Sequence, residues 1–189
     1  MKETNRQIFH LILGVFLSFS VYYGIITPLI ILFLTLLGIA ISIISTKKEI
    51  PIIAWFLKRF GRKNEFPGKG AIFMFIGSFI AAFLFSKDIA SASIIILALG
   101  DSVGPLVGQY GKIKHPLNSR KFLEGSIAGF LSAFIGAMIF VNPFEAFFGA
   151  FFAMLIEGID IKFGADQIDD NLTIPVVSGI TIFLIRLLL

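Results

Sequence analysis

The feature that most constrains this chain is a succession of long apolar runs. A helix needs about 20 residues to cross the hydrocarbon core of a bilayer, where only helices and closed barrels satisfy every backbone hydrogen bond. The chain is 57% hydrophobic and only 15% charged. We therefore predict one all-α domain over residues 1–189, a polytopic bundle of about seven transmembrane helices. Six is the alternative, because the sixth run is short. The runs fall at about 8–25, 28–46, 70–86, 89–108, 124–141, 143–157 and 172–189.

Charged residues gather in the connections between these runs. Segment 47–69 carries seven basic and two acidic side chains, and segment 109–121 carries four basic and no acidic ones. With seven spans, both segments lie on the same side of the membrane as the N-terminus. The positive-inside rule then predicts that this side is cytoplasmic and that the C-terminus lies outside.

Segment 50–63 interleaves aromatic and basic residues. Trp55, Phe56 and Phe60 alternate with cations such as Lys58 and Arg59. This pattern predicts a short amphipathic helix that lies in the membrane interface and contacts anionic lipid.

Segment 157–171 differs from the basic connections because it carries five acidic side chains and one lysine. With seven spans it shares their side of the membrane. Carboxylate oxygens suit Mg²⁺ and Lys or Arg side chains neutralise phosphates, so together the connections could hold a metal-bound nucleoside triphosphate. Two solvated loops with unrelated charges are the alternative.

Asp101 is an acidic residue inside the fourth apolar run. It follows Asp88 by 13 residues, about 20 Å along a helix. A carboxylate at that depth costs on the order of 2–3 kcal/mol, and such residues are usually functional. A structural hydrogen bond to a neighbouring helix is the alternative.

Glycines surround Asp101 at regular spacing, and a similar series begins at Gly125. Small residues at this spacing predict close packing of helices. Bare backbone N–H groups could also approach a phosphate there.

Two further sets of residues are candidates for the same site. Lys121 and Glu124 stand three residues apart at the start of the fifth run, where a capping or ion-pair role is the alternative. Arg6, His10 and Gly14 recur every four residues and share one helical face, where a structural histidine is the alternative. Cysteine is absent, which excludes thiol nucleophiles and disulfides.

Taken together, these motifs resemble the signature of the polyprenol kinases, the family of dolichol kinase, phytol kinase and the CTP-dependent diacylglycerol kinases. That family is distantly similar to CDP-diacylglycerol synthases. Phe122 departs from the pattern, because Ser or Thr often follows the lysine there. The matching residues are RxxxHxxxG at 6–14, GDS at 100–102, Gly108, Gly111, KFLEGS at 121–126 and DNLTIP at 170–175.

The resemblance implies a membrane lipid-alcohol kinase that uses CTP as phosphate donor and Mg²⁺ as cofactor. The acceptor would be an isoprenoid alcohol, such as dolichol, another polyprenol or geranylgeraniol, or diacylglycerol. The chain resembles the compact prokaryotic core of the family, so we expect a prokaryotic cell membrane. Partners would be the lipid bilayer and the two substrates, with no nucleic acid. The glycine faces leave open whether they pack within one chain or in a homo-oligomer.

The resemblance also assigns residues to roles. It implies catalytic roles for Asp101, Lys121, Glu124 and His10. It implies metal binding by Asp101, Glu124 and Asp170. Nucleotide contacts would come from Arg6, Ser102, Gly108, Gly111, Lys112, Lys114, Arg120, Lys121, Ser126 and Asn171.

Two other functions compete with the kinase. A cytidylyltransferase would attach a nucleotide monophosphate to a lipid phosphate. A small transporter or membrane scaffold would carry out no chemistry.

Overall fold

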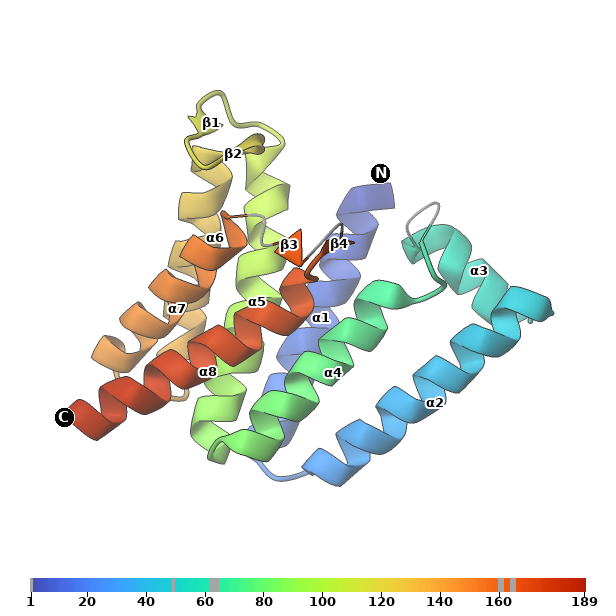
Figure 1. The fold of residues 1–189 in the computed structure, drawn as a ribbon, viewed down its shortest axis with the longest axis horizontal. Coiled ribbons are helices and arrows are strands. Elements are labelled where there is room, and N and C mark those ends of the chain that lie inside the picture. The colour runs from blue at the N-terminus through green and yellow to red at the C-terminus, as the bar shows by residue number, and fades with distance from the viewer. Residues whose placement is uncertain (1, 49, 62–64, 160–161, 164–165) are drawn as a thin grey trace.

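A computed structural model describes residues 2–48, 50–61, 65–159, 162–163 and 166–189. Within these ranges the chain forms eight helices and two short antiparallel hairpins (Figure 1). The predicted all-α class fits, although neither hairpin was predicted. The helices are α1 (Lys2–Tyr22), α2 (Pro28–Lys47), α3 (Pro51–Phe60), α4 (Lys69–Leu84), α5 (Lys87–Gly108), α6 (Leu123–Ala137), α7 (Pro143–Glu157) and α8 (Asp170–Leu188). The strands are β1 (Lys114–His115), β2 (Asn118–Phe122), β3 (Lys162–Phe163) and β4 (Asp166–Gln167).

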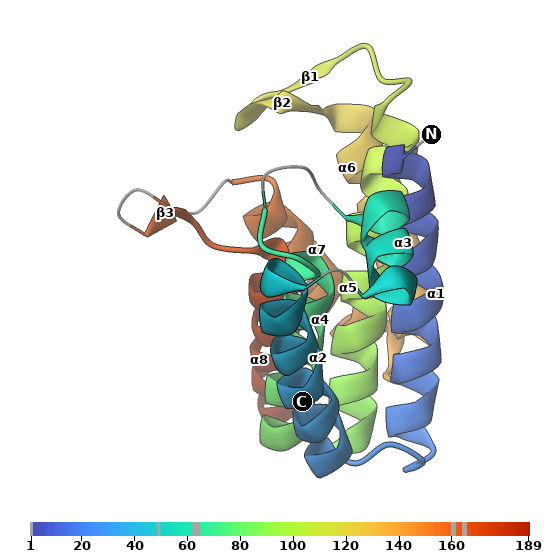
Figure 2. The same cartoon turned by 90° about the vertical axis from the view of Figure 1, so that its right-hand side faces the viewer.

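Helix α5 is the centre of the bundle. It packs against α1, α4, α6, α7 and α8, and Figures 1 and 2 show it surrounded by them. Its middle is a run of fully buried apolar residues from Ile94 to Ala98. An apolar helix of this kind is buried on all sides because its neighbours cover every face.

Glycines bring α5 and α6 close together, as the small-residue spacing predicted. A Cβ added to Gly125 would lie 2.6 Å from the backbone oxygen of Gly104 and 2.8 Å from the Cα of Gly108. Real Cβ atoms do not approach backbone this closely, so the two helices can touch here only without side chains.

The predicted number of seven spans is not confirmed. In the described part of the chain, α2, α5 and α8 are long and apolar enough to cross a membrane, and α4 and α6 are shorter apolar helices. The run at 124–141 is longer than its helix, because α6 ends at Ala137 and turn residues follow. A 15-residue helix such as α6 or α7 spans about 22 Å, less than the roughly 30 Å of hydrocarbon.

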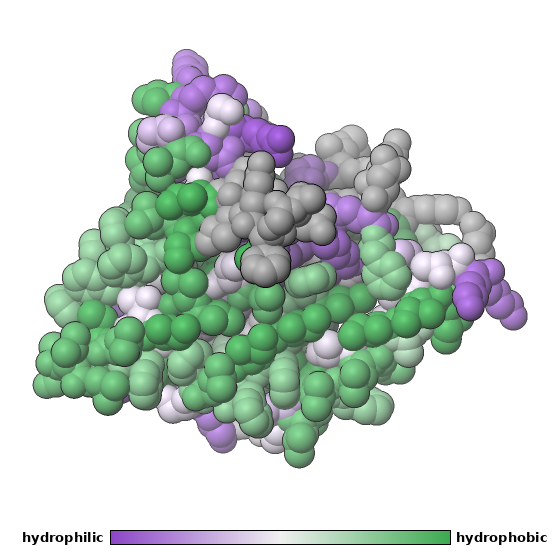
Figure 3. Space-filling model, in the orientation of Figure 1, coloured by the Kyte–Doolittle hydropathy of each residue, from purple (hydrophilic) through white to green (hydrophobic). Residues whose placement is uncertain are grey.

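The charged connections lie at one end of the bundle. The N-terminus, α3 and both hairpins are at this end, and the C-terminus is at the other (Figure 1). Hydrophilic residues gather around the β1–β2 hairpin, while the face over α4 and α8 is broadly hydrophobic (Figure 3). This surface, with the apolar helices, is that of an integral membrane protein.

Helix α3 occupies most of the segment predicted to be an interfacial helix. Pro51 is its first residue, a position where the missing N–H of proline costs nothing. It ends at Phe60, and residues 62 and 63 of the predicted segment lie outside the described residues. Helix α3 packs beside α1 (Figure 2).

Candidate functional site

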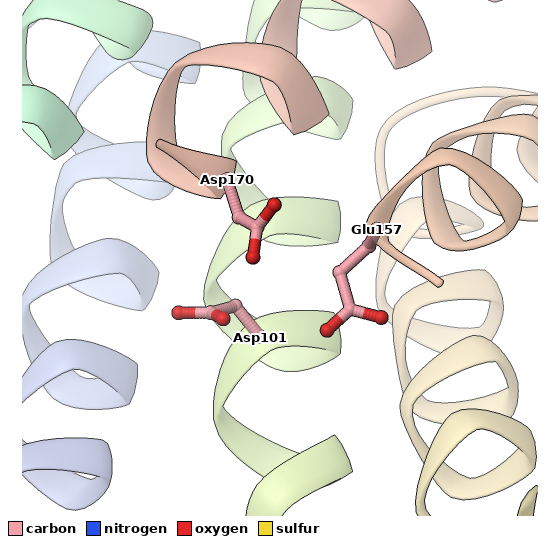
Figure 4. A group of neighbouring side chains, drawn as sticks. All are labelled: Asp101, Glu157 and Asp170. Carbon is pink, nitrogen blue, oxygen red and sulfur yellow. The ribbon is translucent and has the colours of Figure 1, made fainter. Parts of the chain in front are cut away.

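Three carboxylates from three helices converge at the charged end of the bundle. Asp101 is on α5, Glu157 is the last residue of α7 and Asp170 is the first residue of α8 (Figure 4). One oxygen of each lies within 4.8 Å of the others. Glu157 is buried and the two aspartates are partly buried. Like charges this close repel one another unless cations balance them.

Lys121 of β2 supplies one such cation. Its Nζ lies 2.6 Å from Glu157 Oε1 and 3.9 Å from Asp170 Oδ2, and it also donates to the backbone oxygen of Glu157 at 2.5 Å. Burial acts to lower the pKa of Lys121, but attraction to Glu157, Asp170 and Asp101 outweighs burial and raises it. Lys121 is therefore protonated at neutral pH. One lysine against three carboxylates leaves a formal net charge of −2.

His10 of α1 approaches the group from the other side. Its Nε2 lies 3.7 Å from Asp101 Oδ2, which is longer than a hydrogen bond. Arg6, one turn earlier on α1, is paired with Glu3. The structure thus brings together four residues of the predicted site, His10, Asp101, Lys121 and Asp170.

Prolines distinguish the two helices that carry Asp101 and Asn171. Pro105 lies inside α5 and Pro175 inside α8, each four residues after one of these positions. Because proline has no N–H, the backbone carbonyls of Asp101 and Asn171 cannot accept the usual i+4 helical hydrogen bond. The backbone oxygen of Asn171 lies against Gly77 of α4, where an added Cβ would collide with it.

The start of α8 is fixed by a side-chain cap. Asp169 Oδ1 accepts hydrogen bonds from the backbone N–H of Asn171 at 3.1 Å and from its Nδ2 at 2.7 Å. An N-cap aspartate satisfies backbone donors of the first turn. The cap therefore holds Asp170 and Asn171 in place beside Asp101.

Two cavities flank the carboxylates. The first has a volume of about 200 Å³ and lies among α1, α3 and α4. We call it the α3 cavity, and its lining includes Arg6, His10, Lys69, Asp101 and Asn171. The second, the glycine cavity, has a volume of about 230 Å³ and is lined by Gly104, Pro105, Gly108, Gln109, Arg120, Lys121, Phe122, Gly125, Ser126, Met154 and Glu157.

Glu124 has a different position from the one expected of a metal ligand. Its Oε1 accepts hydrogen bonds from the backbone N–H groups of Lys112 at 2.8 Å and Ile113 at 3.1 Å. It is not among the described carboxylates that converge on Asp101. The structure therefore uses Glu124 to join the start of α6 to the chain that enters the β1–β2 hairpin.

The predicted phosphate-binding cations of the hairpin are exposed. Lys112, Lys114 and Arg120 all face solvent, and Lys114 Nζ lies 4.0 Å from the centre of the Phe122 ring. Of these three, only Arg120 lines the glycine cavity.

The small residues predicted to contact nucleotide lie around the glycine cavity, with two exceptions. Gly108 and Ser126 line it. Ser102 is fully buried on α5, and its Oγ has no hydrogen-bond partner among the described residues. Gly111 sits against Phe122 and Glu124, where a Cβ would collide with both side chains.

Glu157 was not among the predicted site residues, although it was counted in the acidic connection. The available signal was its place directly after an apolar run, at the end of the bundle where Asp101 was expected. What the sequence could not indicate is that α7 brings it beside residues 101 and 170.

Comparison with known proteins finds one uncharacterized relative and several relatives that are named as lipid kinases. It is 34% identical over 187 residues to an uncharacterized protein of Methanocaldococcus jannaschii, with 96% of this chain and 93% of that one covered. It is 28% identical over 211 residues to CTP-dependent diacylglycerol kinase 1 of Eremothecium gossypii. That match covers 94% of this chain and 65% of the Eremothecium gossypii protein, so the chain spans less than two thirds of that relative's length.

A plant relative carries a related name. The chain is 26% identical over 145 residues to the probable chloroplastic phytol kinase of Triticum aestivum, which covers 67% of this chain and 47% of the wheat protein. No model of a protein family and no solved structure matches the chain. The relatives named as kinases show that the chain belongs to the polyprenol and lipid kinase-like family of membrane proteins.

Proposed function

We propose that the protein transfers the γ-phosphoryl group of a nucleoside triphosphate to the hydroxyl of a membrane lipid alcohol, with CTP as donor and Mg²⁺ as cofactor. The observation that carries this proposal is the convergence of Asp101, Glu157, Asp170 and Lys121 between two cavities. Phosphoryl transfer depends mainly on positioning and charge stabilisation, which such a cluster can supply. The names of the relatives support CTP.

The residues present fit a magnesium ion. Mg²⁺ takes oxygen ligands at 2.0–2.1 Å, so two of its ligands lie at most about 4.2 Å apart. Three carboxylate oxygens within 4.8 Å of one another reach this spacing after small side-chain rotations. Asp101, Glu157 and Asp170 would hold the ion, which when bound neutralises charge on the donor phosphates.

The glycine cavity suits the triphosphate. Its wall combines Lys121 and Arg120 with Gly108, Gly125 and the hydroxyl of Ser126. Cations neutralise phosphate oxygens, and glycine lets the backbone approach them. Lys121 keeps its positive charge because its pKa is raised, so it can stabilise the negative charge of the transferring group.

The reaction consists of one displacement. The lipid hydroxyl oxygen forms a bond to the γ-phosphorus while the bond from that phosphorus to the β–γ bridging oxygen breaks, which releases the nucleoside diphosphate. The hydroxyl proton passes to Asp101 Oδ2, the oxygen that faces His10 at 3.7 Å. His10, as the neighbour of this oxygen, then stabilises Asp101 in its position at the hydroxyl. A positioned proton acceptor of this kind contributes on the order of 10²–10⁴-fold.

The charged end of the bundle is the cytoplasmic side in this proposal, because it carries the basic connections. Nucleotide would then reach the site from the cytoplasm, and the lipid hydroxyl from the membrane surface.

Labelled nucleotides test the proposal directly. The purified protein is incubated with CTP, ATP or GTP, labelled at the α- or γ-phosphorus, and with geranylgeraniol, phytol, dolichol, diacylglycerol or, for the cytidylyltransferase alternative, a lipid phosphate. We expect γ-label in the lipid, more with CTP than with ATP or GTP, and its loss with EDTA. Appearance of α-label in lipid would identify a cytidylyltransferase instead. Absence of label from every alcohol would refute the kinase.

A further inference from the structure

The α3 cavity has an aromatic wall. The rings of Phe9, Phe56 and Phe60 form a closed trio, with centroids 4.9 Å apart for Phe9 and Phe56, 5.1 Å for Phe9 and Phe60, and 4.7 Å for Phe56 and Phe60. All three line the cavity. The trio joins α3 to α1, so the wall is made by a helix of the bundle and a helix outside it. Such a wall favours hydrocarbon over phosphate.

A neighbouring face of α3, about a quarter turn from Phe56 and Phe60, is built for the membrane interface. Ile52 is 81% exposed and Trp55 is 60% exposed, and the Arg59 guanidinium lies 6.0 Å from the centre of the Trp55 ring. Exposed tryptophan beside a cation is typical of the level of the lipid headgroups. Helix α3 therefore places one face in the interface and the other on the cavity.

Hydrogen-bond acceptors line the same cavity. Asp101 and Asn171 are both in its wall. Asn171 donates its Nδ2 to Asp169 Oδ1 at 2.7 Å, which fixes the orientation of the amide. Its Oδ1 is buried and has no hydrogen-bond partner among the described residues. A buried acceptor without a donor costs free energy, and a bound alcohol supplies that donor until its proton passes to Asp101.

The size of the α3 cavity matches one end of a lipid. Sites that enclose a drug-sized ligand measure about 300–1,000 Å³, and this cavity measures about 200 Å³. It can therefore hold a hydroxyl and the carbons next to it, while the remainder of a long chain stays in the bilayer.

We propose that the α3 cavity binds the hydroxyl end of the acceptor lipid, with Phe9, Phe56 and Phe60 against its first carbons and Asn171 and Asp101 at its hydroxyl. This inference rests on the proposed function for the identity of the lipid as an acceptor. It divides the site into an aromatic cavity for the alcohol and a glycine cavity for the phosphate donor, with the carboxylates between them.

Photolabelling tests this division without requiring turnover. The full-length protein in lipid nanodiscs is exposed to a geranylgeraniol analogue with a diazirine near its hydroxyl, and labelled residues are mapped by mass spectrometry. We expect label on α3 and on the Phe9 turn of α1, displaced by geranylgeraniol but not by a hydrocarbon of the same length. Displaceable label on Phe122 or Met154 of the glycine cavity would overturn the assignment, as would label confined to lipid-facing helix surfaces.

The result separates this inference from the proposed function. Displaceable label in the α3 cavity without any phosphoryl transfer would retain the lipid site and refute the kinase. Phosphoryl transfer with displaceable label in the glycine cavity would retain the kinase and refute the lipid site in the α3 cavity.

Kinetics provide a second readout. Removing one aromatic wall residue with Phe56→Ala should raise KM for the alcohol about tenfold and leave KM for the nucleotide within about twofold. Phe56→Leu should restore most of the loss. The matched control is Phe33→Ala, which removes a phenyl ring that is exposed on α2. A rise in the nucleotide KM alone would contradict the inference.

Discussion

Two groups of partly buried charge lie at opposite ends of the same bundle, and they are built differently. At the end away from the hairpins, Arg186 of α8 binds two carboxylates. Its Nη1 lies 2.6 Å from Asp88 Oδ2, and its Nε and Nη2 donate to the two oxygens of Glu145 at 2.8 and 2.9 Å. This cluster joins the first turns of α5 and α7 to the last turn of α8.

The group around Asp101 contains one more carboxylate and a weaker partner. A guanidinium is a planar fork that binds a carboxylate with two parallel hydrogen bonds, whereas lysine is a single point of charge. Lys121 bonds Glu157 closely and reaches Asp170 only at 3.9 Å. The comparison shows that the Arg186 cluster is complete as a structural clamp. The Asp101 cluster keeps excess negative charge, which a bound metal ion would neutralise.

The largest expected effect on activity comes from a substitution of Asp101. Asp101→Asn keeps the shape of the side chain but removes the charge that would bind metal and accept the hydroxyl proton. We expect phosphoryl transfer to fall about 10³-fold, with no loss of thermal stability in detergent. A variant that loses stability but keeps its rate per folded molecule would mean that Asp101 is structural.

Arg186→Met tests the other end. It leaves Glu145, which is only 3% exposed, without its cation. Breaking one side of a buried ion pair costs about 3 kcal/mol, so the unfolding midpoint in detergent should drop clearly. The rate per folded molecule should stay near that of the wild type. Loss of phosphoryl transfer at unchanged stability would mean that Arg186 takes part in the reaction.

Lys121→Met sharpens the comparison within the site. The loss of its charge removes the partner of Glu157 and a phosphate contact at once. We expect KM for the nucleotide to rise about 10–100-fold, the effect of losing a charge-assisted hydrogen bond. The KM for the alcohol should change less. Equal changes in both constants would contradict the assignment of Lys121 to the glycine cavity.

The smallest effect is expected at the exposed hairpin. Lys114 faces solvent above the Phe122 ring, where a cation–π contact contributes about 0.5–1 kcal/mol. Lys114→Ala should therefore change the nucleotide KM less than about fivefold. A rise in the nucleotide KM as large as that expected for Lys121→Met would show that the hairpin closes over the nucleotide.

Much of the fold follows from hydropathy along the chain. The run at 143–157 is α7, and the run at 28–46 is α2 apart from one residue at its C-terminal end. Helix α3 was predicted, as an interfacial helix, from its interleaved aromatic and basic residues. The β1–β2 hairpin was not predicted, because a short polar hairpin has no extended hydrophobic pattern. The number of spans is not confirmed, because an apolar run such as 124–141 includes turn residues after the helix.

The site was predicted in part. Asp101 stood out because a carboxylate inside an apolar run is costly, and the acidic connection pointed to Asp170. Glu157 was missed as a site residue, because its partners are 36 and 56 residues away and only the packing of α7 brings them together. The clamp around Arg186 was missed for the same reason.

Helix α7 offers the most direct test of the central claim, since it carries a buried glutamate at each end. Glu145 is 3% exposed and belongs to the clamp, whereas Glu157 is 6% exposed and belongs to the candidate site. The measurement is γ-label transfer from CTP to lipid by Glu157→Gln and Glu145→Gln, each normalised to folded protein. Our account predicts that Glu157→Gln loses most of the activity and remains stable, while Glu145→Gln loses stability and keeps its rate. Full activity of Glu157→Gln, or equal losses in both variants, would contradict it.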